Sequence, residues 1–158
     1  MSALPALLLA TTVLASCGPT TEFRETVSSK ILMTSVIEPA ADGVWDAVGT
    51  IMTLEGTEEI QPSTPEEWLA VRNAAIAVAE SANLLLTPRR LIDHDNWTGW
   101  SLDLADAGRA AMVAAELQDP EALFEAGGLI YESCTGCHAE YWPDDPSLQF
   151  EERTQFEQ

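Results

Sequence analysis

Residues 119–141 read DPEALFEAGGLIYESCTGCHAEY, and this stretch carries the strongest pattern in the chain. Asp119 is a good helix N-cap and Pro120 suits the first helical position, so a helix is predicted to begin here. Pro143 is expected to end it. Residues three or four apart share one helix face, and the small or apolar residues at that spacing predict one buried stripe. The stripe consists of Leu123, Gly127, Ile130, Cys134, Cys137 and Tyr141.

The two cysteines of this stripe belong to Cys134-Thr135-Gly136-Cys137-His138, the most specific motif in the chain. Thiols three residues apart lie on one helix face, so both can reach the vinyl groups of one porphyrin. His138 then presents its imidazole to the iron. A C-x-x-C-H motif is typical of c-type haem attachment. We therefore expect one covalent haem c, with Cys134 and Cys137 as thioethers and His138 as proximal iron ligand.

Three other interpretations of the cysteines compete with haem. A thioredoxin-like redox dithiol needs a strand–helix context, which the sequence does not predict. A structural zinc site needs four ligands, and the chain offers Cys134, Cys137, His138 and the distant His94. A short-range disulfide explains neither the histidine nor the position of both cysteines on a buried stripe. Haem attachment explains both features.

Two long helical stretches are predicted in the first half of the chain. Residues 23–54 carry one apolar stripe with Pro39 inside it, so we expect a kink or a restart of the helix at the proline. A second helix is predicted to begin at Pro65, after the N-cap Thr64, and to end at Thr87-Pro88.

A third helix is predicted over about 101–118, after a loop at 94–99. One face of this helix is built from small residues, which allow another helix or a flat cofactor to approach closely. That face consists of Leu104, Gly108, Ala111 and Ala115.

Four amphipathic helices with short connections predict an all-α chain, folded as an antiparallel four-helix bundle. The haem would be attached near the C-terminus of the last helix. The cytochrome domain is expected to span 23–142, followed by an acidic, flexible tail at 143–158.

The charge of the chain excludes one class of partner. Seven Lys and Arg residues stand against 26 Asp and Glu residues, for a formal net charge of −19. Such a chain offers no extended basic patch for phosphates, so nucleic acid is not expected as a partner. The acidic surface either keeps the protein soluble or steers it towards redox proteins with basic docking surfaces.

The position of the haem motif resembles that in one known family. The motif lies on the last of four predicted helices, and in this respect the chain resembles the class II cytochromes, the cytochrome c-prime family. Cys134, Cys137 and His138 match the attachment motif of that family, and Tyr141 matches a tyrosine often found three residues after the histidine. The chain departs from the family at Trp142, where a basic residue is frequent, so the role of that residue is in doubt here.

Two functions follow from this resemblance. The first is an electron carrier, in which both axial positions of the iron are filled. The alternative is a high-spin haem protein that binds nitric oxide or carbon monoxide at an open distal position. An enzyme is not expected, because only His94 is available as a distal acid–base group and it falls in a predicted loop.

The sixth iron ligand is the residue that distinguishes these functions. The resemblance implies a methionine from the first helix, and Met33 lies there on the apolar stripe. Met33 is therefore the candidate distal ligand, although a methionine in this position also fills a core. Met52, placed at the far end of the same predicted helix, Met112 and His94 are weaker candidates.

Several side chains are candidates for contacts with the rest of the haem. A propionate could pair with a cation, although an ordinary surface ion pair is the commoner role for such residues. The candidate cations are Arg24, Lys30 and Arg109. Tryptophans could pack on the porphyrin, with core packing as the default. They are Trp45, Trp68, Trp97, Trp100 and Trp142.

The first residues of the chain indicate export. Residues 1–16 are uncharged and mostly apolar, too short to span a bilayer but suited to a signal peptide. The sequence Leu14-Ala15-Ser16-Cys17 resembles the lipobox of bacterial lipoproteins, which implies a lipid-modified Cys17 followed by a tether over 17–22. The lack of Lys or Arg before the apolar stretch departs from the usual pattern, and a plain signal peptide with a chance cysteine is the alternative. We expect a periplasmic protein anchored to a bacterial membrane.

We expect Cys17→Ser to move the protein from the membrane fraction to the soluble periplasmic fraction, because serine cannot carry the acyl chains expected on Cys17. Stable anchoring needs more than one such chain. Fractionation and mass spectrometry of the mature N-terminus measure this. An unmodified N-terminus in the wild-type protein would contradict the lipoprotein assignment.

Overall fold

The computed structural model describes residues 23–142, so the predicted signal peptide (1–16), the tether with Cys17 (17–22) and the acidic tail (143–158) lie outside the described residues. The described chain is mostly helical and has one small two-stranded sheet. The elements are α1 (Ser29–Leu32), the π-helical segment η1 (Met33–Ile37), α2 (Glu38–Trp45), β1 (Gly49–Thr53), β2 (Gly56–Ile60), α3 (Pro65–Leu84), α4 (Asn96–Leu117) and α5 (Pro120–Tyr141).

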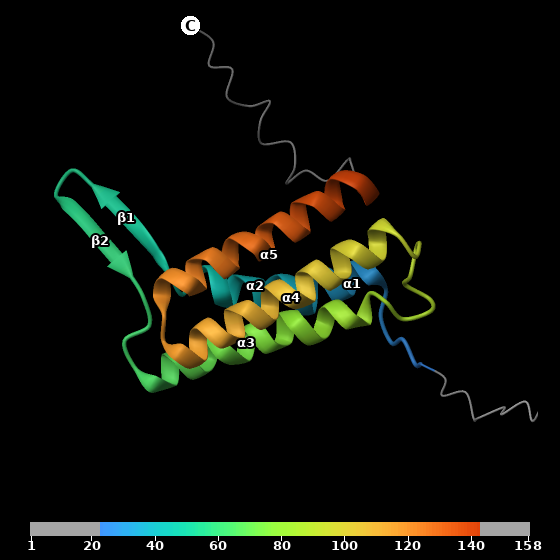
Figure 1. Ribbon diagram of the computed structural model, residues 1–158, viewed down its shortest axis with the longest axis horizontal. Coiled ribbons are helices and arrows are strands. Elements are labelled where there is room, and N and C mark those ends of the chain that lie inside the picture. Colours follow the sequence, from blue (N-terminus) through green and yellow to red (C-terminus); the bar gives the residue numbers. More distant parts are fainter. Residues whose placement is uncertain (1–22, 143–158) are drawn as a thin grey trace, which may run out of the picture.

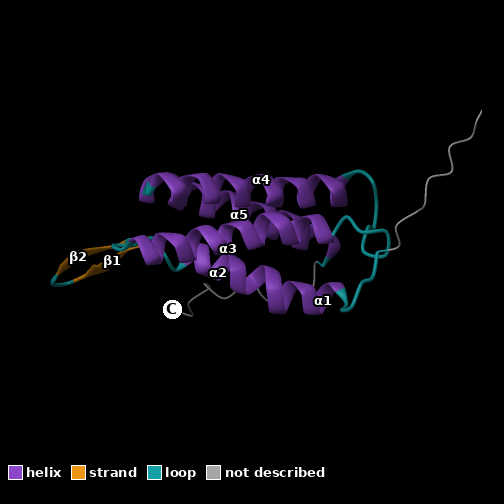
Figure 2. Cartoon of the chain, turned by 90° about the horizontal axis from the view of Figure 1, so that it is seen from below, coloured by secondary structure: helices purple, strands orange, loops and turns teal. Residues whose placement is uncertain are grey.

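The helices lie side by side along one long axis (Figure 1). α3 packs on α4, α4 packs on α5, and α2 contacts both α3 and α5, so the helices surround one core. Because α3, α4 and α5 alternate in direction, the start of α1, the end of α3, the start of α4 and the end of α5 gather at one end (Figures 1 and 2). We call this the motif end, since α5 carries residues 134–138 there. The β-hairpin extends from the opposite end.

The core between the helices is built largely from alanine and other small or branched residues. Four large side chains, Val44, Val78, Leu123 and Ile130, are fully buried in it. None of the helices in the part of the chain that the structure describes is long and apolar enough to cross a membrane.

The prediction that the first helix continues over 46–54 was wrong. The helix ends at Trp45, and the chain then forms the antiparallel pair β1–β2, with Thr53 opposite Gly56 across a two-residue turn. Strand β1 is rich in β-branched residues, which favour strands, and Gly56 has a φ of +149°, a value that other residues rarely adopt. Ile51, which falls at helical spacing on the apolar stripe predicted for 23–54, is 45% exposed on β1.

The expected irregularity at Pro39 is present as a restart of the helix. The five residues from Met33 to Ile37 form a π-helical segment, and α2 begins at Glu38 with Pro39 in its first turn. A proline has no N–H to donate, so the regular hydrogen-bond ladder cannot pass through it. The π-helical segment takes up this interruption just before the proline.

The third predicted helix begins earlier than expected. α4 starts at Asn96, so most of the predicted loop at 94–99 is helical. The carboxylate of Asp93 accepts the backbone N–H groups of Asp95 (2.9 Å) and Trp97 (3.0 Å) and thereby caps the first turn. The buried Trp97 also donates its indole N–H to the carbonyl of Leu85 (3.0 Å), a tertiary contact that local sequence does not reveal.

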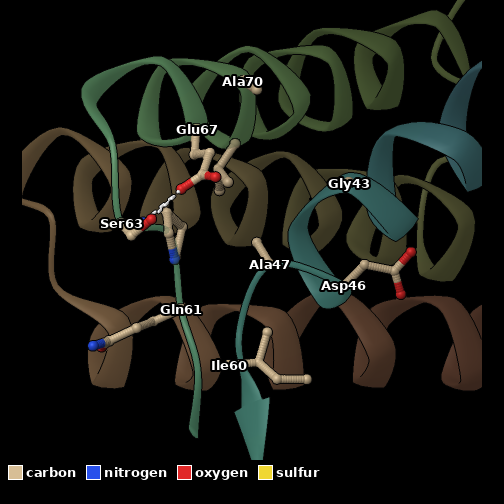
Figure 3. Close-up of a pocket in the computed structure, with 10 residues that line it drawn as sticks. Gly43, Asp46, Ala47, Ile60, Gln61, Ser63, Glu67 and Ala70 are labelled. Carbon is tan, nitrogen blue, oxygen red and sulfur yellow. Dashed lines mark hydrogen bonds between the residues drawn. The ribbon is translucent and has the colours of Figure 1, made fainter.

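The predicted starts of the second and fourth helices are confirmed. Thr64 caps α3 by accepting the N–H of Glu67 (3.2 Å), and the Glu67 carboxylate accepts the N–H groups of Ser63 (2.6 Å) and Thr64 (3.0 Å). Figure 3 shows Ser63 and Glu67 facing each other beside the hollow at the base of the hairpin. These hydrogen bonds, above all that from the Ser63 backbone, lower the pKa of Glu67. Asp119 caps α5 in the same manner.

Helices α3 and α4 approach each other closely at Gly108. A Cβ atom placed there would lie 2.6 Å from the backbone nitrogen of Ala79 and 3.1 Å from the carbonyl oxygen of Ala75. Both contacts are to backbone atoms of α3, which cannot yield without moving the helix. Gly108 therefore sets the distance between these two helices.

We expect Gly108→Ala to lower the free energy of unfolding by about 1–3 kcal/mol, because the added methyl group forces α3 and α4 apart. Gly99→Ala in the same helix is the matched control, since nothing lies within 4 Å of its Cβ position. The control should raise stability by up to about 1 kcal/mol through helix propensity. Equal effects of the two variants in chemical denaturation would contradict the close approach.

Candidate functional site

The structure brings four predicted site residues to one small cavity at the motif end. Cys134, Cys137 and His138 line it from α5, and Met33 lines it from the start of η1, about a hundred positions earlier in the sequence. The cavity measures about 20 Å³. Its other lining residues are mostly apolar: Ile37, Leu85, Trp100, Ser101, Leu104 and Ser133.

Cys134 and Cys137 are not joined to each other by a disulfide. Burial raises the pKa of Cys134 to about 11, and burial together with the nearby Cys134, Glu140 and Asp93 raises that of Cys137 to about 11. A redox dithiol needs a thiol pKa lowered towards neutrality, which positive neighbours or a helix N-terminus provide. The environment here acts in the opposite direction and keeps both thiols protonated.

His138 is half-buried and sits one turn after Cys134 on α5. Its imidazole packs edge-to-face on the indole of Trp142, with ring centroids 5.9 Å apart and an interplanar angle of 61°. The Trp142 backbone N–H donates to the carbonyl of His138 (2.8 Å). Trp142 therefore holds the last turn of α5 and the histidine ring together.

Trp100 covers the motif from α4. A Cβ atom on Gly136 would lie only 2.3 Å from the Trp100 ring, so the indole lies directly on this glycine, between the two cysteines in sequence. Glu140 fixes the arrangement, because its carboxylate accepts the indole N–H of Trp100 (3.1 Å) and the side-chain amide of Asn96 (2.7 Å). Glu140 was not predicted as a site residue, although its position one turn after Gly136 placed it on the same helix face.

The donor set would suit a c-type haem, whereas the space around it is too small as it stands. Two thiols at helical spacing and an adjacent imidazole are the groups that attach such a haem, and the thioether of Met33, which lines the same cavity, could serve as a distal ligand. A cavity of about 20 Å³ is far smaller than a porphyrin. Attachment would therefore require the Trp100 ring and the start of α4 to move away from α5.

A second set of contacts ties the end of α5 to the loop before α4. The Tyr141 hydroxyl donates to the carboxylate of Asp93, and its ring packs edge-to-face on Trp97, with centroids 5.1 Å apart. The hydrogen bond from Tyr141 is the main cause of a lowered pKa at Asp93. Burial first, and then Asp93, raises the pKa of Tyr141. Tyr141 thus closes the motif end beneath the cavity.

The competing ligands named from the sequence do not line this cavity. Met52 lies on β1 with 81% of its side chain exposed, and its predicted place on a helix was wrong. Met112 packs beside the core on α4, more than two helical turns beyond Leu104. His94 is exposed in the loop before α4.

The predicted cations and the remaining tryptophans also lie elsewhere. Arg24 and Lys30 are exposed, and Arg109 pairs with Asp106 on the surface at 3.1 Å. Trp45 donates to the carbonyl of Gly127 (2.9 Å) outside the cavity. Trp68 and Trp97 belong to the core. The cation that the sequence analysis missed is Arg90, which is buried at the motif end.

No group of three or more His, Cys, Asp or Glu side chains within 23–142 is arranged to hold a metal ion, so the zinc alternative finds no ligand set in that range. The chain matches no protein-family model, and no curated protein or solved structure is significantly similar to it.

We expect Tyr141→Phe to lower the thermal midpoint at neutral pH, because it removes the donor to the Asp93 carboxylate while keeping the ring. The pKa of Asp93 is lowered in the folded protein, so this stabilisation is present above the ordinary carboxyl pKa and is lost as the pH falls through the folded-state value. The difference between wild type and variant should therefore narrow in acid. Tyr131→Phe, at an exposed tyrosine, is the control and should change little.

Proposed function

We propose that this protein is a c-type cytochrome that carries electrons, built as an antiparallel four-helix bundle with one covalent haem. Cys134 and Cys137 form the thioethers, His138 is the proximal ligand and Met33 the distal ligand. One observation carries the proposal: residues from the first and last helices, far apart in sequence, line the same cavity.

The chain's own residues perform three tasks in this role. A bound haem supplies one-electron exchange at its iron. The apolar walls, including Leu85 and Leu104, exclude water from the ligands and so favour the less charged state of the site. Trp142 orients the imidazole of His138 through the ring contact and the backbone hydrogen bond described above.

The backbone at Met33 supports its role as distal ligand. Met33 is the first residue of η1, and short π-helical segments inside helices occur frequently at functional sites. The wider turn changes the direction in which the following side chains point. Met33 and Ile37 both reach the cavity, whereas the intervening residues 34–36 are exposed.

The surface charge supports docking to basic redox partners. Exposed acidic residues lie near the motif on α4 (Asp103), on α5 (Glu132 and Glu140) and just before α4 (Asp95). No basic residue lies on α5 except His138. An electron-transfer partner with a positive patch would therefore be attracted to the α4–α5 side of the motif end. Lipidated Cys17 would keep the protein at the periplasmic face of a membrane.

The test is the optical spectrum of the purified protein, oxidised and reduced, with and without carbon monoxide. We expect haem to remain bound through acid–acetone extraction and the reduced wild-type spectrum to be unchanged by carbon monoxide. Met33→Ala should become high-spin, bind carbon monoxide and have a lower midpoint potential, because a thioether ligand raises the potential. Met112→Ala is the matched control and should keep the wild-type spectrum.

Further variants separate the parts of the proposal. Cys137→Ser should leave one thioether, and His138→Ala should lose proximal ligation while keeping covalent haem. Complete extraction of haem from the wild type would overturn covalent attachment. Ready binding of carbon monoxide by the wild type, with no change on Met33→Ala, would replace the electron carrier by the gas-binding alternative.

A further inference from the structure

Arg90 is a buried cation that has no acidic partner. It is only 8% exposed, and its guanidinium donates to three neutral acceptors. They are the carbonyl of Leu84 (3.2 Å), the hydroxyl of Thr87 (3.4 Å) and the carbonyl of Val27 (3.0 Å). No carboxylate within the described range 23–142 forms an ion pair with it. Buried arginines are normally paired, because a charge taken out of water is costly.

One of the Arg90 donors is left without an acceptor. The buried Nε atom has no hydrogen-bond partner among the described residues. A guanidinium has five N–H groups in a rigid fork, and only three hydrogen bonds are made here. An unsatisfied buried donor is unfavourable, and one on a charged group is more so. An oxyanion, either a carboxylate or a phosphate, is the acceptor that this fork matches best.

A purely structural role accounts for part of this arrangement. Through Nη1 and Nη2, Arg90 joins the C-terminal end of α3 to the segment before α1, and a cation is favourable near helix carbonyls. These hydrogen bonds leave the Nε–H of Arg90 without an acceptor and place no negative charge beside its guanidinium. A neutral amide side chain would provide similar bonds to carbonyls without a buried charge.

Arg90 also lines a hollow whose other residues suit an anion. The hollow measures about 400 Å³ and is formed by Arg89, Arg90 and the segment 25–29, which includes the hydroxyl groups of Thr26, Ser28 and Ser29. Its one acidic residue, Glu25, is engaged by Arg89: the carboxylate accepts the Arg89 N–H (3.1 Å) and lies 3.7 Å from its Nε. The hollow therefore keeps one surplus positive charge in a chain of net charge −19.

We propose that this hollow is an oxyanion-binding site in which Arg90 is the principal ligand residue. Two sources offer the required chemistry, a propionate carboxylate of the haem and a free inorganic anion such as phosphate. The hollow and the cavity share the motif end, because Arg90 binds the carbonyl of Leu84 and the next residue, Leu85, lines the cavity. The propionate source rests on the proposed function, whereas the free anion does not.

The first measurement is calorimetric titration of the purified full-length protein with inorganic phosphate, at constant ionic strength. If the site takes a free anion, the wild type binds phosphate and Arg90→Gln weakens binding roughly tenfold or more, because a charge-assisted hydrogen bond is lost. Arg109→Gln, which makes the same charge change at an exposed site, should bind as the wild type does.

The second measurement distinguishes the propionate. If a haem carboxylate fills the site, the haem-loaded protein does not bind phosphate, and Arg90→Gln shifts the pH dependence of the midpoint potential while Arg109→Gln does not. Should the protein carry no haem, the proposed function fails and the phosphate titration alone decides the site.

Ser29→Asp tests the site without removing Arg90, so its result does not depend on whether the Arg90 variant folds. It leaves Arg90 in place and introduces a carboxylate into the hollow, so it should raise the thermal midpoint in phosphate-free buffer and prevent phosphate binding. The proposal is overturned if phosphate does not bind and Arg90→Gln leaves the pH dependence of the potential unchanged. It is also overturned if Arg90→Gln and Arg109→Gln behave alike in both measurements.

Discussion

The close approach of α3 to α4 at Gly108 is the constraint on which the rest of the structure depends. The glycine lies against the backbone of Ala79, and the alanines around it, such as Ala75 and Ala111, let the two helices share a thin, dense core. Small side chains leave little space between helices. The cavity of about 20 Å³ lies beyond these alanines, at the motif end.

At the motif end, larger side chains replace the alanines and meet from every helix. Met33 and Ile37 arrive from η1, Leu85 from the end of α3 and Trp100 from α4, opposite the two cysteines. Polar ties hold this end closed, since Glu140 binds α4 and the Tyr141 hydroxyl binds the loop before it. These ties lie at the end of α5 and the start of α4. A group placed between α4 and α5 would displace Trp100 and leave the Gly108 contact intact.

The charge distribution follows the same division along the molecule. The excess of acid is solvated on the helix surfaces, where each carboxylate costs little. The guanidinium of Arg90, in contrast, is a charged group that is buried. It lies near the end of α3 and also holds the segment before α1. A buried positive charge is unfavourable unless an anion pairs with it. The anion proposed for the hollow would supply that partner, and this links the hollow beside Arg90 to the proposed function of the motif end.

The sequence by itself determined the features that depend on neighbouring residues. The caps at Thr64 and Asp119, the interruption at Pro39 and the placing of Cys134 and Cys137 on one face of the last helix all follow from local spacing, and the structure has each of them. Trp97 was predicted to lie in a loop and strand β1 was predicted to be helical. Both predictions were wrong because the local sequence patterns are ambiguous.

Only the tertiary structure decided what distant segments do to one another. The burial of Trp97 against Leu85 extends α4 backwards, and the chain beyond Trp45 forms a hairpin where the sequence predicted a continuing helix. The same holds for Met33 facing the cysteines, for Trp100 covering Gly136 and for Arg90 in its hollow. Each of these depends on the distance between helices, which the packing of small residues sets and which no local pattern in the chain contains.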